Sequence, residues 1–261
     1  MARTRRQAVG WSTVLRELEV VGVEDITPGM RRVTLTGEQF EGFAVEGGAL
    51  PAFRSEGFDD HVKLLVPVEG QERPPLPVQG PDRLEWGGAG GRPVAKDYTP
   101  RRYDPATREL DIDFVRHGHG FAAGWAERVE PGEPAWIVGP TRSLLLPEGQ
   151  DWMLIAGDET ALPAIGRLLD EWRPGDRAQV VVELTEDAHR QDLVVPDGVE
   201  LTWVVGADAW IDTVRALPWW EGVAFCWVAG ETRTIRQVRD YLKTERAVAR
   251  DCLDVTGYWR R

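Results

Sequence analysis

The chain of 261 residues has few of the residues that staple small proteins or bind metals. It contains only two cysteines, Cys226 and Cys252, and four histidines. The two cysteines have neither CxxC nor metal-ligand spacing. We therefore expect two buried thiols in a reducing compartment, and no disulfide framework or structural metal site.

Long apolar runs and an excess of basic residues are also missing. No stretch approaches the roughly 18 apolar residues that a membrane-spanning helix needs. The basic start, Met1 to Arg6, is not followed by an apolar run, so it does not read as a secretory signal. We expect a cytoplasmic protein. The net charge of −12 argues against sequence-independent nucleic-acid binding, because phosphate neutralisation needs a basic surface.

The first half of the chain is built from short β-type runs. Hydrophobic residues make up 42% of the sequence, which is enough for a substantial core. Glycine and proline separate segments that are rich in β-branched and apolar residues, and these predict strands at 14–23, 30–36, 61–66, 109–116 and 135–138. Residues 69–95 are rich in proline and glycine and predict a loop. This pattern indicates a small antiparallel barrel.

The second half alternates between strands and helices. Compact apolar runs predict strands at 152–156, 179–184, 201–205 and 224–229. Helical periodicity covers 161–172, and a later helix places Ile235, Val238 and Leu242 on one face. Such alternation is typical of a parallel sheet covered by helices. We predict two domains, 1–149 and 150–261.

Two segments of the first domain combine groups that suit a flavin nucleotide. Lys96 to Arg102 offers an aromatic face, a hydroxyl and clustered cations, although a solvated basic strand would look the same. Asp113 to Ala126 runs from a strand through a small-residue turn into a short helix, whose N-terminal amides can bind an anion. His117 and His119 in that turn could be metal ligands, but no third ligand has a telling spacing. A contact with phosphate or ribose is favoured.

One segment of the second domain lies where α/β sheets bind ligands. Gly157 to Ile165 follows the carboxyl end of the first parallel strand. The GxGxxG fingerprint is absent, so a standard Rossmann dinucleotide site is excluded. Gly139 to Ser143 follows the last strand of the first domain, where an ordinary interdomain turn is the alternative.

Together these segments resemble the siderophore-interacting protein family, the ferric-siderophore reductases of the flavin reductase and ferredoxin-NADP reductase-like superfamily. The matching motifs are Tyr98–Arg102, Asp113–Gly118, Trp125–Ala126, Gly139–Pro140, Gly157–Ile165, Trp227–Glu231 and Gly257–Arg260. The resemblance implies an N-terminal antiparallel Greek-key β-barrel that binds FAD. A C-terminal parallel α/β domain that binds NADH or NADPH would follow it.

The resemblance also implies roles for individual residues. On the flavin side these are Lys96, Tyr98, Thr99, Arg101, Asp113, Val115 and His117, with the amides of Ala122 and Ala123 on the pyrophosphate. On the nicotinamide side they are Thr160 and Ala161, with Glu231 where the two cofactors meet. The sequence departs from the family pattern at three places: Lys96 replaces an arginine, Phe121 a proline, and Thr141-Arg142 the pair Arg-Gly. These departures bear on FAD and donor binding.

We assign Lys63 to the electron acceptor. Alternation in the strand at 61–66 places Val62, Leu64 and Val66 in the core and His61, Lys63 and Leu65 outside. The resemblance places this strand beside the flavin edge, where a cation would attract an anionic ferric siderophore. A solvated surface lysine is the alternative.

The functional expectation is a monomeric enzyme that reduces ferric siderophores with electrons from NAD(P)H and so releases Fe²⁺ for iron assimilation. Ferredoxin is an alternative electron donor, and we expect no protein nucleophile and no acid–base dyad. Acidic residues in 183–187 favour NADH, because they would repel a 2′-phosphate, whereas Arg190 opposes this preference. Two other functions stay open: an NAD(P)H:flavin reductase with another acceptor, and a non-catalytic siderophore- or flavin-binding module.

Overall fold

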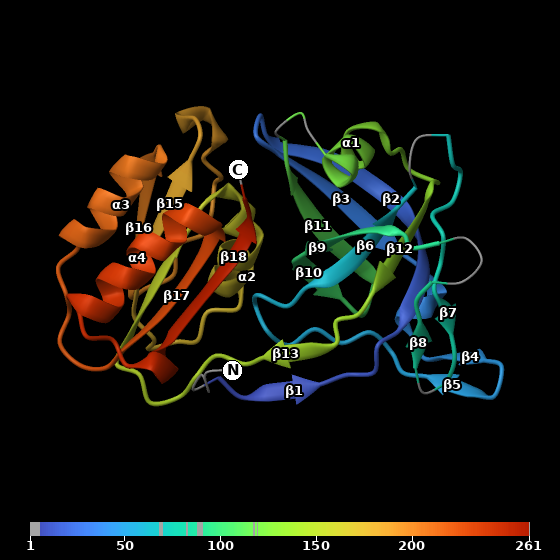
Figure 1. The fold of residues 1–261 in the computed structure, drawn as a ribbon, viewed down its shortest axis with the longest axis horizontal. Helices are drawn as coiled ribbons and strands as arrows, with labels where there is room; N and C mark the ends of the chain where they lie inside the picture. The colour runs from blue at the N-terminus through green and yellow to red at the C-terminus, as the bar shows by residue number, and fades with distance from the viewer. Residues whose placement is uncertain are drawn as a thin grey trace. The chain divides into compact units, whose positions relative to one another are not determined.

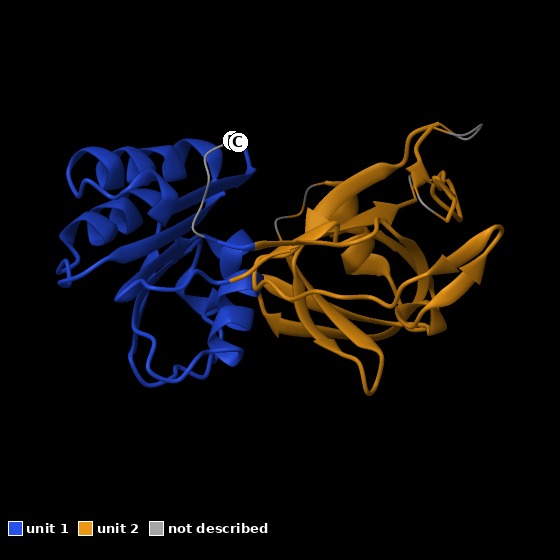
Figure 2. Ribbon diagram, turned by 90° about the horizontal axis from the view of Figure 1, so that it is seen from below, with its two compact units in different colours: residues 1–7, 146–261 blue, residues 8–145 orange. Residues whose placement is uncertain are grey.

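The computed structural model describes residues 6–67, 70–81, 83–87, 91–116, 118 and 120–260. The chain forms two compact units (Figure 2). Residues 8–145 form one unit, and residues 146–261 together with residues 1–7 form the other. None of the helices in the described ranges is long and apolar enough to cross a bilayer.

The unit of residues 8–145 is a curled antiparallel sheet of seven strands (Figure 1). The strand order is β10-β11-β3-β2-β12-β6-β9. The strands are β2 (Leu15–Thr27), β3 (Met30–Thr36), β6 (Val62–Val66), β9 (Val94–Tyr98), β10 (Pro100–Asp104), β11 (Glu109–Val115) and β12 (Pro134–Val138). All five strands predicted in this half are confirmed, and β2 runs four residues further than predicted.

The concave side of this sheet is filled by the apolar residues of each alternating pattern. Leu110, Ile112 and Phe114 of β11 are at most 1% exposed and pack in one cluster with the helix α1 (Phe121–Arg128). Asp111 and Asp113 point to the other side, as alternation requires, yet they are also buried. Alternation therefore predicted the direction of these two carboxylates but not the arginines that cover them.

Smaller elements complete this unit. They are β1 (Ala8–Gly10) paired with β13 (Arg142–Leu144), the hairpin of β4 (Phe43–Val45) and β5 (Gly48–Leu50), the hairpin of β7 (Val78–Gln79) and β8 (Leu84–Glu85), and a 3₁₀ turn at Glu38–Phe40. The predicted loop at 69–95 thus contains a short hairpin and the first residues of β9.

The alternation predicted for β6 is confirmed. Val62, Leu64 and Val66 belong to the core cluster, and Leu65 faces the other side with Lys63. Leu65 is nevertheless only 1% exposed, because a second, small apolar cluster with Trp136 and Val138 covers this part of the outer face of the sheet. Lys63 does point outward.

The other unit is a parallel sheet of five strands in the order β16-β15-β14-β17-β18. The strands are β14 (Trp152–Gly157), β15 (Ala178–Leu184), β16 (Val199–Val205), β17 (Ala224–Glu231) and β18 (Leu253–Trp259). The helices are α2 (Leu162–Asp170), α3 (Ala207–Ala216) and α4 (Thr232–Thr244), with 3₁₀ turns at Glu159–Ala161, Asp187–His189 and Arg250–Cys252. The expected antiparallel sheet followed by a parallel α/β sheet is confirmed.

The order of the parallel strands creates a switch point. From β14 the chain moves outward to β15 and β16, and it then returns to form β17 and β18 on the other side of β14. Every residue of β14 and β17 is buried, as expected for central parallel strands. Ligands in open α/β sheets bind at the carboxyl ends of the strands that flank such a point. Here those ends are Gly157 and Glu231.

Candidate functional site

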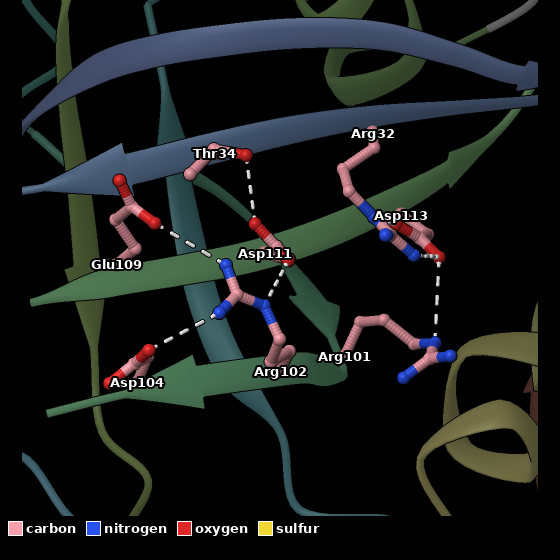
Figure 3. A network of polar contacts seen from close by, with 8 residues as sticks. All are labelled: Arg32, Thr34, Arg101, Arg102, Asp104, Glu109, Asp111 and Asp113. Atoms are coloured by element: carbon pink, nitrogen blue, oxygen red, sulfur yellow. Dashed lines mark hydrogen bonds and ion pairs between the residues drawn. The ribbon is translucent and has the colours of Figure 1, made fainter. Parts of the chain in front are cut away.

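A network of arginines and carboxylates spans β3, β10 and β11 (Figure 3). Arg32 donates two hydrogen bonds to Asp113, of 2.7 Å from Nε and 2.9 Å from Nη2. Arg101 Nε lies 4.0 Å from Asp113 Oδ2, the oxygen that also accepts from Arg32 Nη2. The side chain of Asp113 is fully buried, so two cations stabilise its charge. Arg101, which is 9% exposed, is the second cation near Asp113.

A second buried carboxylate, Asp111, lies two residues before Asp113 on the same side of β11 and also pairs with an arginine. Asp111 accepts hydrogen bonds of 2.8 Å from Thr34 Oγ1 and from Arg102 Nε. Arg102 also pairs with Glu109 and Asp104 (Figure 3). The charge of Arg102 is thus neutralised by carboxylates of β10 and β11. The two neighbouring arginines therefore have different partners: Arg101 lies beside Asp113, and Arg102 pairs with Asp111.

An aromatic chain leads from the end of β9 to α1. The ring of Tyr98 packs on Phe114, with 4.4 Å between the ring centroids, and Phe114 packs on Trp125 at 5.8 Å. Burial raises the pKa of Tyr98 to about 12, so its phenol is neutral at physiological pH. Thr99, which is 8% exposed, joins this strand to β10 and Arg101. A flat ring, a hydroxyl and a cation therefore follow one another along one bend of the chain, with the ring on Phe114 and the cation beside Asp113.

The N-terminus of α1 is open toward an anion. Gly120 precedes it with φ of 90°, and no described side chain caps the helix. The first turn carries no acidic residue, and Ala122 and Ala123 are small. Uncapped amides and the helix dipole favour a negative group at this end. His117 and His119 lie outside the described residues.

The remaining predicted residues of this unit are more exposed. Lys96 is exposed on β9, and Val115 is half-buried at the end of β11. Lys63 forms an ion pair of 2.7 Å with Asp97 of β9, and both side chains are about half exposed. The cation assigned to the acceptor thus already has a neighbouring carboxylate.

In the parallel unit, Asp158 connects the loops at the switch point. It is 8% exposed and accepts hydrogen bonds from Thr160 N (2.9 Å), Glu231 N (2.8 Å) and the indole of Trp259 (2.8 Å). The hydroxyl of Thr160 donates to it as well. Burial raises the pKa of Asp158 above its usual range. The structure therefore brings together Thr160 and Glu231, both predicted for this site.

Sequence reasoning missed two members of this cluster. Asp158 lies inside the Gly157–Ile165 motif, and Trp259 lies inside the Gly257–Arg260 motif. Both motifs were recognised, but no role was attached to either side chain. The one feature of the sequence that points to Asp158 as a site residue is its place within the long Gly157–Ile165 motif.

Glu231 and Ala161 have local structural roles. The carboxylate of Glu231 caps α4 by accepting from Arg233 N (2.7 Å) and Thr234 N (2.8 Å). Such a cap satisfies helix amides that would otherwise lack a partner. Ala161 is fully buried beneath the loop, so its methyl group packs in the core.

A neighbouring carboxylate ties this loop to the end of β15. Glu159 accepts from Thr185 N at 2.8 Å, and it lies 2.7 Å from His189 Nδ1. Arg190, which opposed the expected preference for NADH, forms an ion pair of 2.7 Å with Asp187. The charge of Arg190 is therefore offset by Asp187, one of the acidic residues in 183–187 that favoured NADH.

The chain matches two family models. Residues 19–144 match the siderophore-interacting FAD-binding domain, and residues 150–261 match the siderophore-interacting protein. Among curated proteins, the ferric vibriobactin reductase ViuB of Vibrio cholerae is 30% identical over 254 residues, which cover 94% of this chain and 89% of the relative. The NADPH-dependent ferric-chelate reductase of Escherichia coli is 32% identical over 236 residues, which cover 88% of this chain and 87% of the relative.

Solved structures agree with these matches. A siderophore utilization protein from T. fusca is 34% identical with a TM-score of 0.85, and the alignment covers 98% of this chain and 96% of that one. The siderophore-interacting protein SipS from Aeromonas hydrophila is 26% identical with a TM-score of 0.77, with coverage of 95% and 92%. The chain therefore belongs to the siderophore-interacting protein family.

Proposed function

We propose that this protein is an FAD-dependent reductase that passes electrons from NAD(P)H to a ferric siderophore. One observation carries the proposal: the antiparallel unit contains a neutral aromatic ring that is linked through Phe114 and Trp125 to a helix with an uncapped N-terminus, and a buried arginine, Arg101, follows that ring along the chain. The named activities of the relatives in Vibrio cholerae and Escherichia coli support the acceptor class.

These residues fit FAD. A flavin ring needs a flat partner, which Tyr98 offers, and polar groups at its edge, which Thr99 and Arg101 offer. A pyrophosphate needs amides and space for close approach, which Ala122 and Ala123 offer at the start of α1. We assign Lys96, Asp113, Val115 and His117 to the same cofactor, with Asp113 acting through Arg101.

The sheet order supports a Greek-key barrel. β9 lies at one edge of the seven-stranded sheet and β10 at the other, and only Thr99 separates them along the chain. We infer that the two are halves of one strand that bends at Thr99 and joins both edges of the sheet. The domain roles follow: residues 1–149 bind FAD, and residues 150–261 bind the nicotinamide donor.

The switch point of the parallel sheet supports the donor site. Thr160 and Ala161 follow the carboxyl end of β14, and Glu231 ends β17, where ligands of such sheets bind. We assign these three residues to the nicotinamide. When bound, FAD supplies the chemistry that links a two-electron donor to a one-electron acceptor. Siderophores hold Fe³⁺ with hard oxygen ligands, which bind Fe²⁺ less tightly, so reduction releases the metal.

We further assign Lys63 to the acceptor, and we place the enzyme in the cytoplasm as a monomer. Ferredoxin is the alternative donor, and a flavin reductase with another acceptor is the second candidate function. Its support is the shared superfamily fold, also present in a cytochrome P450 reductase with a TM-score of 0.62.

An anaerobic titration tests the proposal. The purified protein should contain FAD, and NADH or NADPH should bleach the flavin absorbance. A ferric siderophore should then restore the absorbance, while a chelator traps Fe²⁺. Recovery of FMN alone would overturn the pyrophosphate assignment. Bleaching without recovery by any ferric siderophore would favour the second candidate function, and no bleaching would favour a non-catalytic binding module.

A further inference from the structure

The exposed side of α1 carries an aromatic ring that the core of the antiparallel unit does not use. Phe121 is the first residue of this helix and is 57% exposed, whereas five of the seven phenylalanines of the chain are at most 4% exposed. The opposite side of α1 is buried in the core cluster through Ala122, Trp125 and Ala126. Among the described residues, no aromatic ring packs on Phe121. Core packing therefore does not explain this phenylalanine.

The start of the helix does not explain it either. Phenylalanine has a lower helix propensity than alanine. Proline, which Phe121 replaces in the family pattern, would pre-organise the first helical turn. The ring lies instead directly before Ala122 and Ala123, whose amides the proposed function assigns to the pyrophosphate of FAD. An exposed ring thus adjoins the candidate phosphate site.

The exposed side of α1 continues over Gly124 to Arg128. Residues three and seven positions apart share one helix face, and here Phe121 and Arg128 are exposed while Gly124 is half-buried. A Cβ atom on Gly124 would lie 3.2 Å from Arg128 Nη1, so the glycine lets the guanidinium approach the helix backbone. Gly124 lies roughly 4.5 Å along the helix axis from Phe121. No carboxylate of the described residues forms an ion pair with Arg128. A flat ring and a flat cation are therefore about one turn apart.

We propose that this side of α1 binds the adenine of FAD and that Phe121 is the residue that stacks on the base. Nucleobases stack on aromatic side chains and on guanidinium planes, which Phe121 and Arg128 supply. The adenosine is joined to the pyrophosphate, so it belongs beside the residues that adjoin the phosphate site. The inference rests on the proposed function, because it requires FAD on this helix. It adds the residue that makes the site prefer FAD to FMN.

Flavin titrations of the full-length apoprotein test this assignment without any turnover. FAD carries the adenosine that FMN lacks, so the two dissociation constants together isolate the contribution of the adenosine. In Phe121→Ala the Kd for FAD should rise about fivefold or more, which corresponds to at least about 1 kcal/mol for a lost base stack. The Kd for FMN should stay unchanged. Phe121→Leu, which keeps an apolar side chain without a ring, should show most of the same loss.

Gly124→Ala provides a second measurement, because its effects on folding and on binding should be opposite. Alanine stabilises a helix interior relative to glycine, and the new methyl group meets only the movable end of Arg128. The denaturation midpoint of the apoprotein should therefore rise. The same methyl group occupies the space beside the guanidinium, so the Kd for FAD should rise severalfold while the Kd for FMN stays constant. A purely structural role would not separate these readouts.

Val78→Ala is the matched control. Val78 of β7 belongs to the same unit and is 60% exposed, close to the exposure of Phe121. Both flavins should bind this variant as they bind the wild type. An unchanged Kd for FAD in Phe121→Ala, or an equal rise for FAD and FMN, would overturn the adenine assignment.

Failure of this inference can be told apart from failure of the proposed function. Unchanged FAD affinity in Phe121→Ala and Gly124→Ala, in a protein that reduces ferric siderophores, would overturn the adenine assignment alone. A selective loss of FAD affinity in a protein that reduces no ferric chelate would support the adenine assignment and overturn the proposed function. A wild-type protein that binds no flavin would overturn both.

Discussion

The indole N–H of Trp259 in β18 donates a hydrogen bond of 2.8 Å to Asp158, which follows β14. The same carboxylate oxygen accepts the amide of Glu231 at 2.8 Å. One buried carboxylate thus joins the ends of three parallel strands. Gly230 makes this possible: a Cβ atom there would lie 2.6 Å from Asp158 Oδ2, and its φ of 147° disfavours other residues.

Asp158→Asn should weaken donor binding. The amide nitrogen of asparagine cannot accept a hydrogen bond, so at least one of the donors from Thr160, Glu231 or Trp259 would lose its partner. We expect a loss of about 1–3 kcal/mol in the free energy of unfolding. We also expect a rise in the KM for NAD(P)H of about tenfold, with little change in the maximal rate of flavin reduction, measured by stopped-flow absorbance.

The control is Asp240→Asn, which alters an exposed carboxylate of α4 that pairs only with its neighbour Arg239 in the contacts described. Asp240→Asn should leave both the free energy of unfolding and the KM for NAD(P)H unchanged. If Asp158→Asn loses stability but keeps its KM, Asp158 is a purely structural residue.

Tyr98→Ala should reduce FAD affinity more than it reduces stability. An aromatic stack contributes about 0.5–1.5 kcal/mol beyond its area burial, or roughly a two- to tenfold change in affinity. Fluorescence titration of the apoprotein with FAD measures this change. Tyr103→Ala removes a tyrosine of the same sheet that packs on Phe40 and Phe53 instead. Equal losses of affinity in both variants would show that Tyr98 only packs.

The raised pKa of Tyr98 predicts a decline in stability at alkaline pH. Its folded pKa of about 12 exceeds the usual 10.0 because burial disfavours the phenolate. The folded state therefore holds this proton more tightly, and the stabilisation is complete below pH 10. It is lost as the pH rises from 10 toward 12, by about 2–3 kcal/mol at most. Denaturant unfolding of the apoprotein across this range should show a shallower decline in Tyr98→Phe. Parallel curves would refute the assignment.

Lys63→Ala and Asp97→Asn should change acceptor binding in opposite directions. Their ion pair is half exposed, so it contributes only about 0.2–1 kcal/mol. Removal of the cation should raise the KM for an anionic ferric siderophore about two- to fivefold. Removal of the carboxylate frees the cation and should lower that KM. The rate of flavin reduction by NAD(P)H should stay constant in both variants. If neither KM moves, Lys63 is an ordinary surface charge.

Local pattern predicted most of the longer elements, and it missed α3 and β18 of the parallel unit for a clear reason. α3 lies against the sheet through Trp210, Ile211 and Val214, but its ten residues follow Gly206 without a side-chain cap. β18 is an edge strand that contains Asp254 and Gly257, so it lacks a continuous apolar run. Both are stabilised mainly by packing against neighbours that are distant in the sequence.

The sequence by itself determined the two-part architecture and the segments that carry the chemistry. Tyr98, Thr99 and Arg101 are adjacent along the chain, so their chemistry can be read locally. Only the tertiary structure decided that Asp158 meets Trp259, 101 residues away. It also decided that Asp113 meets Arg32 of β3. The physical reason is that such contacts depend on strand order and register, which periodicity does not specify.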